Sequence, residues 1–223
     1  MGPDAIYAVC RGRLLALAPS LTEDQIGSSL AATPPWTALD GYRHLAGVCA
    51  DVLDGVMEGA GSPAWTAAQL AARAQRSLEE VCAEWGARGP ECDDRMAAAG
   101  TAMAFVAFDV WTHEQDIRAA VGLPGIRDDA VVAALAPLVL TSFGPRYSAT
   151  GGPPLRVILD GESSVLGDGE PRATLTTTGY ELLRIVFGRR SEDQTRVAGW
   201  TGERDLVIPG IHLFDFPAVD ILD

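Results

Sequence analysis

The spacing of apolar residues changes about two thirds of the way along the chain, and this change constrains the fold most. Before residue 144, apolar residues recur with helical period, for example at 39, 42, 45, 46, 49, 52 and 53. Beyond it, LRVILDG (155–161) and RATLTTT (172–178) alternate like strands. The stretch between them, GPRYSATGGPP (144–154), is rich in Gly and Pro, which is typical of a domain boundary. We therefore predict an α+β chain, with a helical domain over 1–145 and a small α+β domain over 150–223.

Helix ends follow from capping patterns and breaks. Thr37 with Asp40, and Thr178 with Glu181, have the three-residue spacing of a capping box. GARGPECDDR (86–95) is predicted to be a polar loop, and TRVAGW (195–200) a strand. Helices are predicted over 5–18, 37–58, 66–85, 96–121, 128–143 and 179–190.

Charge excludes two classes of partner. The formal net charge is −13, with 17 basic and 30 acidic residues, and the basic residues cluster only at Arg189 and Arg190. Neither nucleic acid nor an anionic membrane surface is expected to bind such a chain. The N-terminus shows no secretory signal, and AVVAALAPLVL (130–140) is too short to span a bilayer and contains Pro137. We expect a cytoplasmic protein with no membrane span.

Few residues are available for metal or thiol chemistry. The four cysteines form no CxxC pair, which favours reduced thiols in the core. The chain has three histidines, His44, His113 and His212. His212 lies in a tail without partner spacing and is interpreted as structural.

The segment DVWTHEQDIR (109–118) places ionisable groups on an apolar helix. Asp109, His113 and Asp116 fall within about 60° of each other on a helical wheel. The helix is apolar nearly all round and is predicted to be buried, with Glu114 and Arg118 as its charged exit to solvent. A buried carboxylate costs several kcal/mol unless it is paired or binds a metal. Two interpretations follow: a metal site, or an Asp–His hydrogen bond that joins two helices.

His44 strengthens the metal interpretation. It lies roughly 135° from the centre of the apolar stripe of its helix, so it is not an ordinary core histidine. It belongs either on the surface or in a separate polar pocket. As a third ligand it would complete a set of two imidazoles and one carboxylate, which leaves a position open for water or substrate.

Three motifs resemble one known family. PPWTALDGYRHLAG (34–47), FDVWTHEQDIRAAVGLPG (108–125) and ATLTTTGYELLRIVFGRRSED (173–193) occur in the order of the mycothiol-dependent maleylpyruvate isomerase family of actinobacteria. The resemblance implies a DinB-like four-helix bundle at the N-terminus and a small α+β domain similar to a sterol carrier protein at the C-terminus.

The resemblance also implies site residues. His44, Asp109 and His113 match positions that bind a divalent metal in that family, usually zinc, although the isomerase has Glu where this chain has Asp109. Asp116 matches an aspartate that follows the second histidine. Arg189 or Arg190 is the expected match to an arginine that binds substrate or mycothiol, and helix C-capping is the alternative role for these two residues.

The implied activity is chemistry of a thiol on a small electrophile. A metal-activated mycothiol would conjugate the electrophile, as in a thiol S-transferase, or assist its cis–trans isomerisation, with Asp116 orienting His113 or moving a proton. Two alternatives are a metal-dependent hydrolase and a non-catalytic binding or regulatory protein stapled by its metal. The protein is expected to be a monomer or a homodimer.

Overall fold

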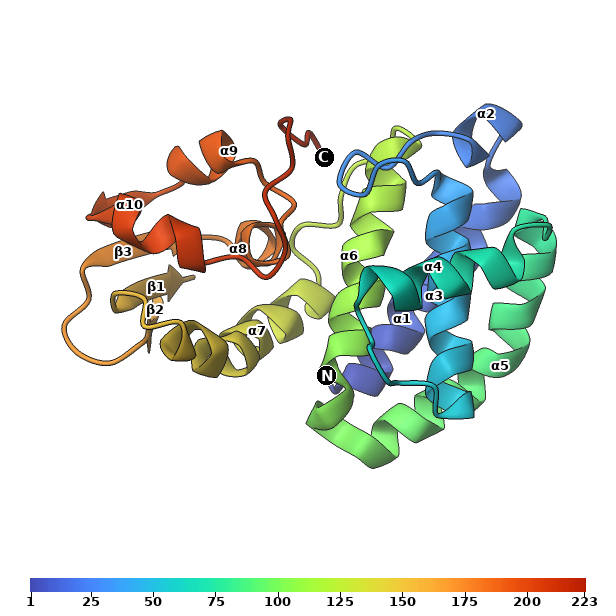
Figure 1. The fold of residues 1–223 in the computed structure, drawn as a ribbon, viewed down its shortest axis with the longest axis horizontal. Helices are drawn as coiled ribbons and strands as arrows, with labels where there is room; N and C mark the ends of the chain where they lie inside the picture. Colours follow the sequence, from blue (N-terminus) through green and yellow to red (C-terminus); the bar gives the residue numbers. More distant parts are fainter. The chain divides into compact units, whose positions relative to one another are not determined.

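A computed structural model describes residues 1–223, which divide into two compact units. The bundle unit comprises Met1–Gly125 together with Asp223, and the mixed unit comprises Ile126–Leu222. In Figure 1 the bundle unit runs from blue to green and the mixed unit from yellow to red. Each unit is described on its own below.

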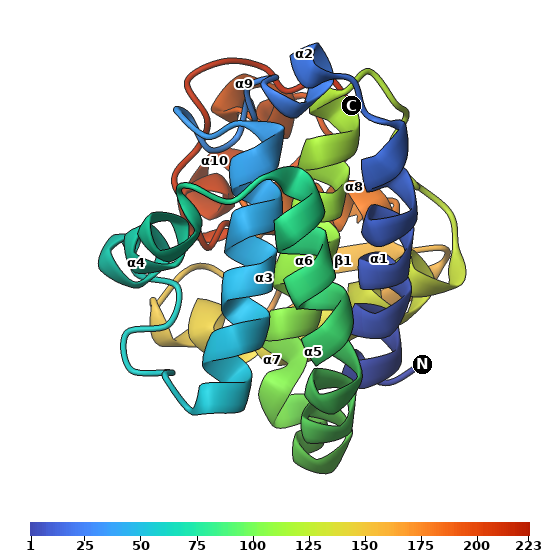
Figure 2. The same ribbon diagram turned by 90° about the vertical axis from the view of Figure 1, so that its right-hand side faces the viewer.

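Four long helices form the bundle unit. The helices α1, α3, α5 and α6 pack against each other, and α4 packs on α3, as Figure 2 shows. The predicted N-terminal helical bundle is therefore confirmed. Its elements are α1 (Pro3–Leu17), η1 (Ala18–Ser20), α2 (Glu23–Ile26), α3 (Ala38–Asp54), α4 (Pro63–Arg73), α5 (Leu78–Ala99), η2 (Gly100–Met103) and α6 (Ala104–Ala120).

Buried polar atoms of the bundle core bond to one another. The indole N–H of Trp85 on α5 donates to the hydroxyl oxygen of Tyr7 on α1 at 2.7 Å. The hydroxyl of Tyr42 on α3 donates to the carbonyl of Leu14 at 2.9 Å. Both bonds lie in the core, where an unmade hydrogen bond would cost free energy of folding. They fix how α1, α3 and α5 face each other.

The predicted loop at 86–95 was wrong, because α5 runs through it and through Pro90. Trp85, Gly89, Cys92 and Met96 are all buried and keep helical spacing. The polar residues of this segment occupy the other side of one amphipathic helix. The predicted helix over 66–85 is instead split between α4 and α5, and Ser77 caps α5 in a capping box with Glu80.

The mixed unit contains one small sheet with helices. Its strand order is β2-β1-β3-β4, with β1 and β3 parallel and the other pairs antiparallel. The helix α7 packs on α8 and on β2. The α+β class is therefore confirmed. Its elements are α7 (Ala130–Ala149), β1 (Leu155–Leu159), β2 (Glu162–Leu166), β3 (Ala173–Thr177), α8 (Gly179–Val186), α9 (Glu192–Arg196), β4 (Trp200–Gly202), α10 (Arg204–Val207) and η3 (Ile208–Gly210).

The structure places the break between units earlier than the Gly/Pro-rich stretch. The helix α7 continues to Ala149 through Pro145, and the compact units divide after Gly125. Gly144 allows close packing, because a Cβ there would lie 3.2 Å from the Leu166 side chain. The buried Tyr147 then donates a hydrogen bond to the carbonyl of Pro153 at 2.6 Å. Packing within the mixed unit thus overrides the helix-breaking composition of 144–149.

Two further differences concern the apolar helix and the last strand. By length and composition α7 is apolar enough to cross a membrane, but half of its most apolar window is buried in the structure. Of the expected strand over 195–200, the first two residues end the helix α9, which a capping box of Ser191 and Gln194 begins, and residues 197–199 form a turn. Only Trp200–Gly202 forms the strand β4.

The unit boundary predicts where the folded chain is cut first. Residues 121–129 join α6 to α7 without regular helix or strand. A protease of broad specificity at low ratio should therefore cleave first within 121–129, and mass spectrometry of the fragments would locate the cut. A first cut within 144–150 would instead support the boundary predicted from composition.

Candidate metal centre

Two histidines and one aspartate converge within the bundle unit. His44 comes from α3, while Asp109 and His113 lie one turn apart on the neighbouring α6. Their ligand atoms all lie within 4.8 Å of one another. The Nε2 atom of His44 is 3.3 Å from Asp109 Oδ2, and Nε2 of His113 is 3.7 Å from Asp109 Oδ1. The structure therefore brings together the three residues predicted as ligands, here called the trio.

The trio is buried except at its carboxylate. His44 is 3% exposed and His113 is 5% exposed. The Asp109 side chain is 29% exposed, so the trio reaches solvent on the side of the carboxylate.

The neighbours of His44 determine which nitrogen carries its proton. Gln69 on α4 donates from Nε2 to Asp51 Oδ2 at 2.7 Å, because a carboxylate only accepts. The Gln69 Oε1 atom then faces His44 Nδ1 at 2.7 Å and must accept from it. His44 therefore carries its proton on Nδ1 and presents the lone pair of Nε2 to Asp109.

His113 is oriented in the same way. Its Nδ1 lies 3.4 Å from Oδ2 of Asp116, whose side chain is 1% exposed. A carboxylate at this distance favours a proton on Nδ1, which leaves the lone pair of Nε2 toward Asp109. This is the orienting position expected for Asp116. Asp116 therefore contacts His113 on the side of the ring away from Asp109.

The trio fits a divalent cation. With both imidazoles neutral, two nitrogen lone pairs and one carboxylate face each other at 3.3 Å and 3.7 Å, which is repulsive without a positive charge between them. A proton on one imidazole would satisfy only one of the two contacts, whereas a central cation satisfies all three groups. Two imidazoles and one carboxylate are a common donor set of catalytic zinc and iron sites, with at least one open position.

Local sequence explains how α3 and α4 come this close. Gly47 lies one turn after His44, and a Cβ there would be 2.6 Å from Gln69 Cβ. Only glycine allows α4 to bring the Gln69 amide to His44. Thr37 and Asp40 begin α3 with the predicted capping box. Burial acts to raise the pKa of Asp40, but hydrogen bonds from Thr37 outweigh it and leave that pKa lowered.

Sequence reasoning missed Gln69 and Gly47 and misplaced Glu114. Asp51 is seven residues after His44 and therefore lies on the same helix face, but no pattern in the sequence connects α4 to that face. Glu114 was expected at the solvent side of α6, and it is 0% exposed. The helix α1 covers that face of α6, and Arg13 lies 3.8 Å from Glu114 Oε2.

The two predicted arginines are held inside the mixed unit. Arg190 donates two hydrogen bonds to Glu181, at 2.8 Å and 2.9 Å, in a bidentate pair. Burial acts to raise the pKa of Glu181, but bonding to Arg190 and then to Arg127 lowers it overall. Arg189 donates to the carbonyl of Phe187 at 2.7 Å, just after α8 ends, which is the capping role. A role of either arginine in binding substrate or thiol stays a prediction.

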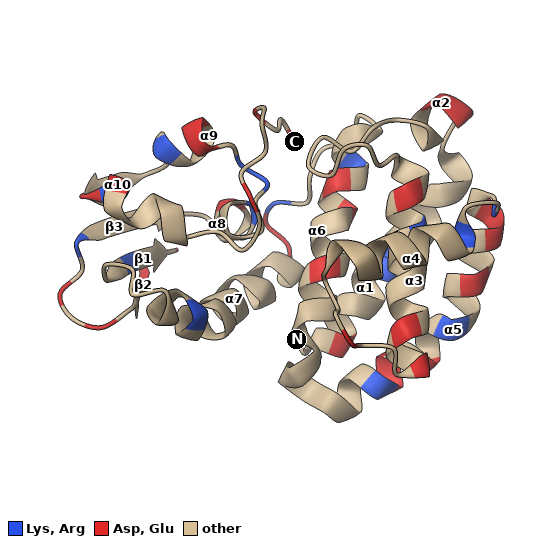
Figure 3. Ribbon diagram, viewed as in Figure 1, with Lys and Arg blue, Asp and Glu red and all other residues tan.

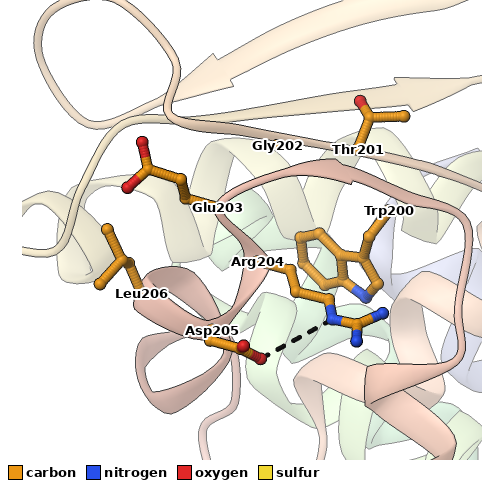
Figure 4. A pocket seen from close by; sticks show the side chains of 7 residues that line it. All are labelled: Trp200, Thr201, Gly202, Glu203, Arg204, Asp205 and Leu206. Atoms are coloured by element: carbon orange, nitrogen blue, oxygen red, sulfur yellow. Dashed lines mark ion pairs between the residues drawn. The ribbon is translucent and has the colours of Figure 1, made fainter.

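Two other places, one in each unit, carry polar or ionisable groups. A hollow of about 500 Å³ in the mixed unit is lined by residues 200–206, including the exposed ion pair of Arg204 and Asp205 (Figure 4). It contains no histidine or cysteine. In the bundle, a hydrogen bond from Cys92 lowers the pKa of the Cys49 thiol to about 7, but Cys49 is fully buried beside Tyr7. No electrophile reaches it in the folded chain.

Comparison with known proteins concerns the fold. No family model and no curated protein sequence matches the chain. A crystal structure of mycothiol-dependent maleylpyruvate isomerase is 11% identical, with a TM-score of 0.49, over 84% of this chain and 88% of the other. The structure of a histidine-to-alanine mutant of that enzyme is 10% identical, with a TM-score of 0.48, at the same coverage. These are structures of the protein family that the sequence motifs resemble.

The Gln69 contact predicts a loss of metal affinity. Gln69→Leu removes the acceptor that holds the proton on Nδ1 of His44, so Nε2 loses its fixed lone pair. Affinity for Zn²⁺ should fall by about 10- to 100-fold, measured by competition with a chromogenic chelator. Gln25→Leu is the matched control, because that amide bonds to the carbonyl of Val121 and contacts no member of the trio. Equal affinity in both variants would contradict the assigned orientation.

Proposed function

We propose that this chain is a metal-dependent enzyme that uses a low-molecular-weight thiol, mycothiol, to conjugate or isomerise a small electrophile. The observation that carries the proposal is the convergence of three lone-pair donors on one point with a side open to solvent. The motifs that resemble the maleylpyruvate isomerase family support the choice of thiol. Zinc is the metal we expect, and the cytoplasm, where thiols stay reduced, is the expected location.

Each residue around the trio has a part in the proposal. His44, Asp109 and His113 hold the metal, Gln69 and Asp51 orient His44, and Asp116 orients His113. A bound divalent cation supplies a Lewis acid that lowers the pKa of a thiol from about 8.5, so that thiolate forms at neutral pH. Asp116 also keeps a proton on Nδ1 of His113 while the reaction proceeds.

The chain itself offers neither an exposed thiol of ordinary pKa nor a lysine amine as a nucleophile. Cys10, Cys49 and Cys92 are buried, and Cys82 is partly buried with its pKa raised to about 11 by burial. The 17 basic residues are all arginines, so no lysine amine is present. In the proposal, a low-molecular-weight thiol bound from solution therefore acts as the nucleophile.

The thiol is the only reactant that conjugation or isomerisation requires besides the electrophile. The thiolate sulfur forms a bond to an electrophilic carbon. In conjugation a leaving group departs with the electron pair, or a proton is added to the neighbouring carbon. In isomerisation the adduct rotates about the former double bond, and the carbon–sulfur bond then breaks to return the thiol unchanged.

The two alternatives are less well supported. A metal that only staples the fold needs a closed site with four ligands, whereas the trio supplies three. A hydrolase would use the same trio with water as the nucleophile. Thiol dependence of turnover separates the hydrolase from the proposed enzyme.

Metal analysis tests the trio. The purified protein should contain close to one divalent ion per chain by mass spectrometry of the metal, because three donors face one point. His113→Ala should lose that ion because it removes one donor, while His212→Ala, outside the trio, should retain it. Stoichiometric metal in His113→Ala would refute the site.

Turnover tests the thiol and the role of Asp116. Asp116→Asn should keep most of the metal, because Asp116 contacts His113 rather than the central point. Turnover should nevertheless fall by about 10- to 100-fold. Asp109→Asn should release the metal, because it removes a ligand charge.

Two outcomes would change the assignment. Metal loss in Asp116→Asn together with metal retention in Asp109→Asn would exchange the two roles. Turnover of an electrophile without added thiol would favour the hydrolase.

A further inference from the structure

Two tryptophans border the imidazoles of the trio. The indole of Trp36 stacks on the His113 ring, with centroids 5.7 Å apart and an interplanar angle of 23°. It also lies 5.2 Å from the His44 ring. Trp65 on α4 meets His44 edge-on from 6.3 Å. Both indoles are partly exposed, so indole surface lies beside the one side of the trio that reaches solvent.

Hydrogen bonds hold the backbone of Trp36 and the indole of Trp65. The backbone N–H of Trp36 donates to Thr33 at 2.9 Å, and its carbonyl accepts from Leu30 at 2.8 Å. Trp65 donates its indole N–H to the carbonyl of Val56 at 3.0 Å. Because that N–H is already bonded, Trp65 offers the site apolar ring surface rather than a hydrogen bond. Rigid aromatic surface of this kind favours flat, conjugated ligands.

The bundle side of the trio offers little positive charge to an anion. Arg43, next to His44 in the sequence, bonds to Asp40 and to the carbonyls of Ala74 and Arg76. Asp51 and Asp116 add negative charge behind the two imidazoles. Acidic side chains also outnumber basic ones across the bundle unit (Figure 3). Apart from the bound cation, a substrate with two carboxylates would therefore meet mainly negative charge on the bundle side of the trio.

We propose that Trp36 and Trp65 form the substrate wall of the trio, and that the substrate is a flat, conjugated electrophile of low charge. This inference rests on the proposed thiol-dependent function. In it, the indole rings hold the π-system of the electrophile beside the open side of the trio. The imidazoles behind Trp36 stay oriented by Gln69 and Asp116, so the indoles select the substrate rather than hold the metal.

The test compares three electrophiles with one thiol and the zinc-loaded enzyme. The probes are 1-chloro-2,4-dinitrobenzene, which is flat and neutral, iodoacetamide, which is small and not aromatic, and maleate, which carries two charges. Trp36→Leu should raise KM for the flat probe by about three- to tenfold, which is the range of one aromatic contact. The value of kcat, the metal content and the rate with iodoacetamide should stay unchanged. Trp36→Phe should restore most of the lost affinity.

Control variants and a binding measurement keep the two proposals separate. Trp65→Leu tests the second indole on a different helix if Trp36→Leu fails to fold. Phe105→Leu is the control, since Phe105 is an exposed aromatic residue on α6 and is not part of the trio. Calorimetric binding of the unreactive 1,3-dinitrobenzene to the zinc-loaded protein should weaken in the tryptophan variants and not in the control.

Three outcomes would contradict the proposal that Trp36 and Trp65 form the substrate wall. These are equal rate losses for all probes, loss of metal in the tryptophan variants, and maleate as the best substrate. If no electrophile turns over with thiol, the proposed function fails, and the calorimetric result then still decides whether the indoles bind a flat ligand.

Discussion

The meeting of three electron-pair donors at one point is the constraint on which the bundle depends. Nε2 of His44 and Nε2 of His113 both face the Asp109 carboxylate, at 3.3 Å and 3.7 Å. In the buried interior of the bundle, such an arrangement is unfavourable unless a positive charge joins it. A cation bound as proposed would therefore add to apolar packing in holding α3 against α6. A bundle designed only for stability would place hydrophobic residues there.

The surrounding residues make this arrangement specific. Gln69 links Asp51 to His44 through hydrogen bonds of fixed direction. Its amide N–H donates to Asp51, so its amide oxygen accepts from Nδ1 of His44. Asp116 lies directly beside Nδ1 of His113 and favours a proton on that nitrogen. The absence of a side chain at Gly47 lets α4 approach closely enough for the first of these bonds. The absence of a Cβ at Gly47 thus permits the Gln69 contact, and that contact determines which nitrogen of His44 carries the proton.

Local patterns in the sequence predict much of this, and contacts between distant segments account for the rest. The spacing of Asp109, His113 and Asp116 follows from the geometry of one helix, so their shared face was predictable. The helix-starting role of Thr37 was predictable for the same reason. Gln69 was not, because nothing in α4 indicates which helix it packs against.

The errors in secondary structure have the same origin. The helix α5 continues through Pro90 because its buried positions keep their period, and tertiary packing outweighs the cost of one proline. The helix α7 continues through Pro145 because Tyr147 and the small Gly144 pack within the mixed unit. Composition alone favours a loop in both places. Burial of one helical face favours the helix over the loop in both places.

The short side chain of Asp109 is consistent with this geometry. Both oxygens of Asp109 lie 3.3 Å from Nε2 of His44, and Oδ1 also lies 3.7 Å from Nε2 of His113. A carboxylate held on a short side chain and one turn before His113 can therefore face both imidazoles at once. A glutamate at the same place carries an additional methylene, and its carboxylate would have to fold back to occupy the same point. The shorter residue thus keeps all three donors directed at one centre.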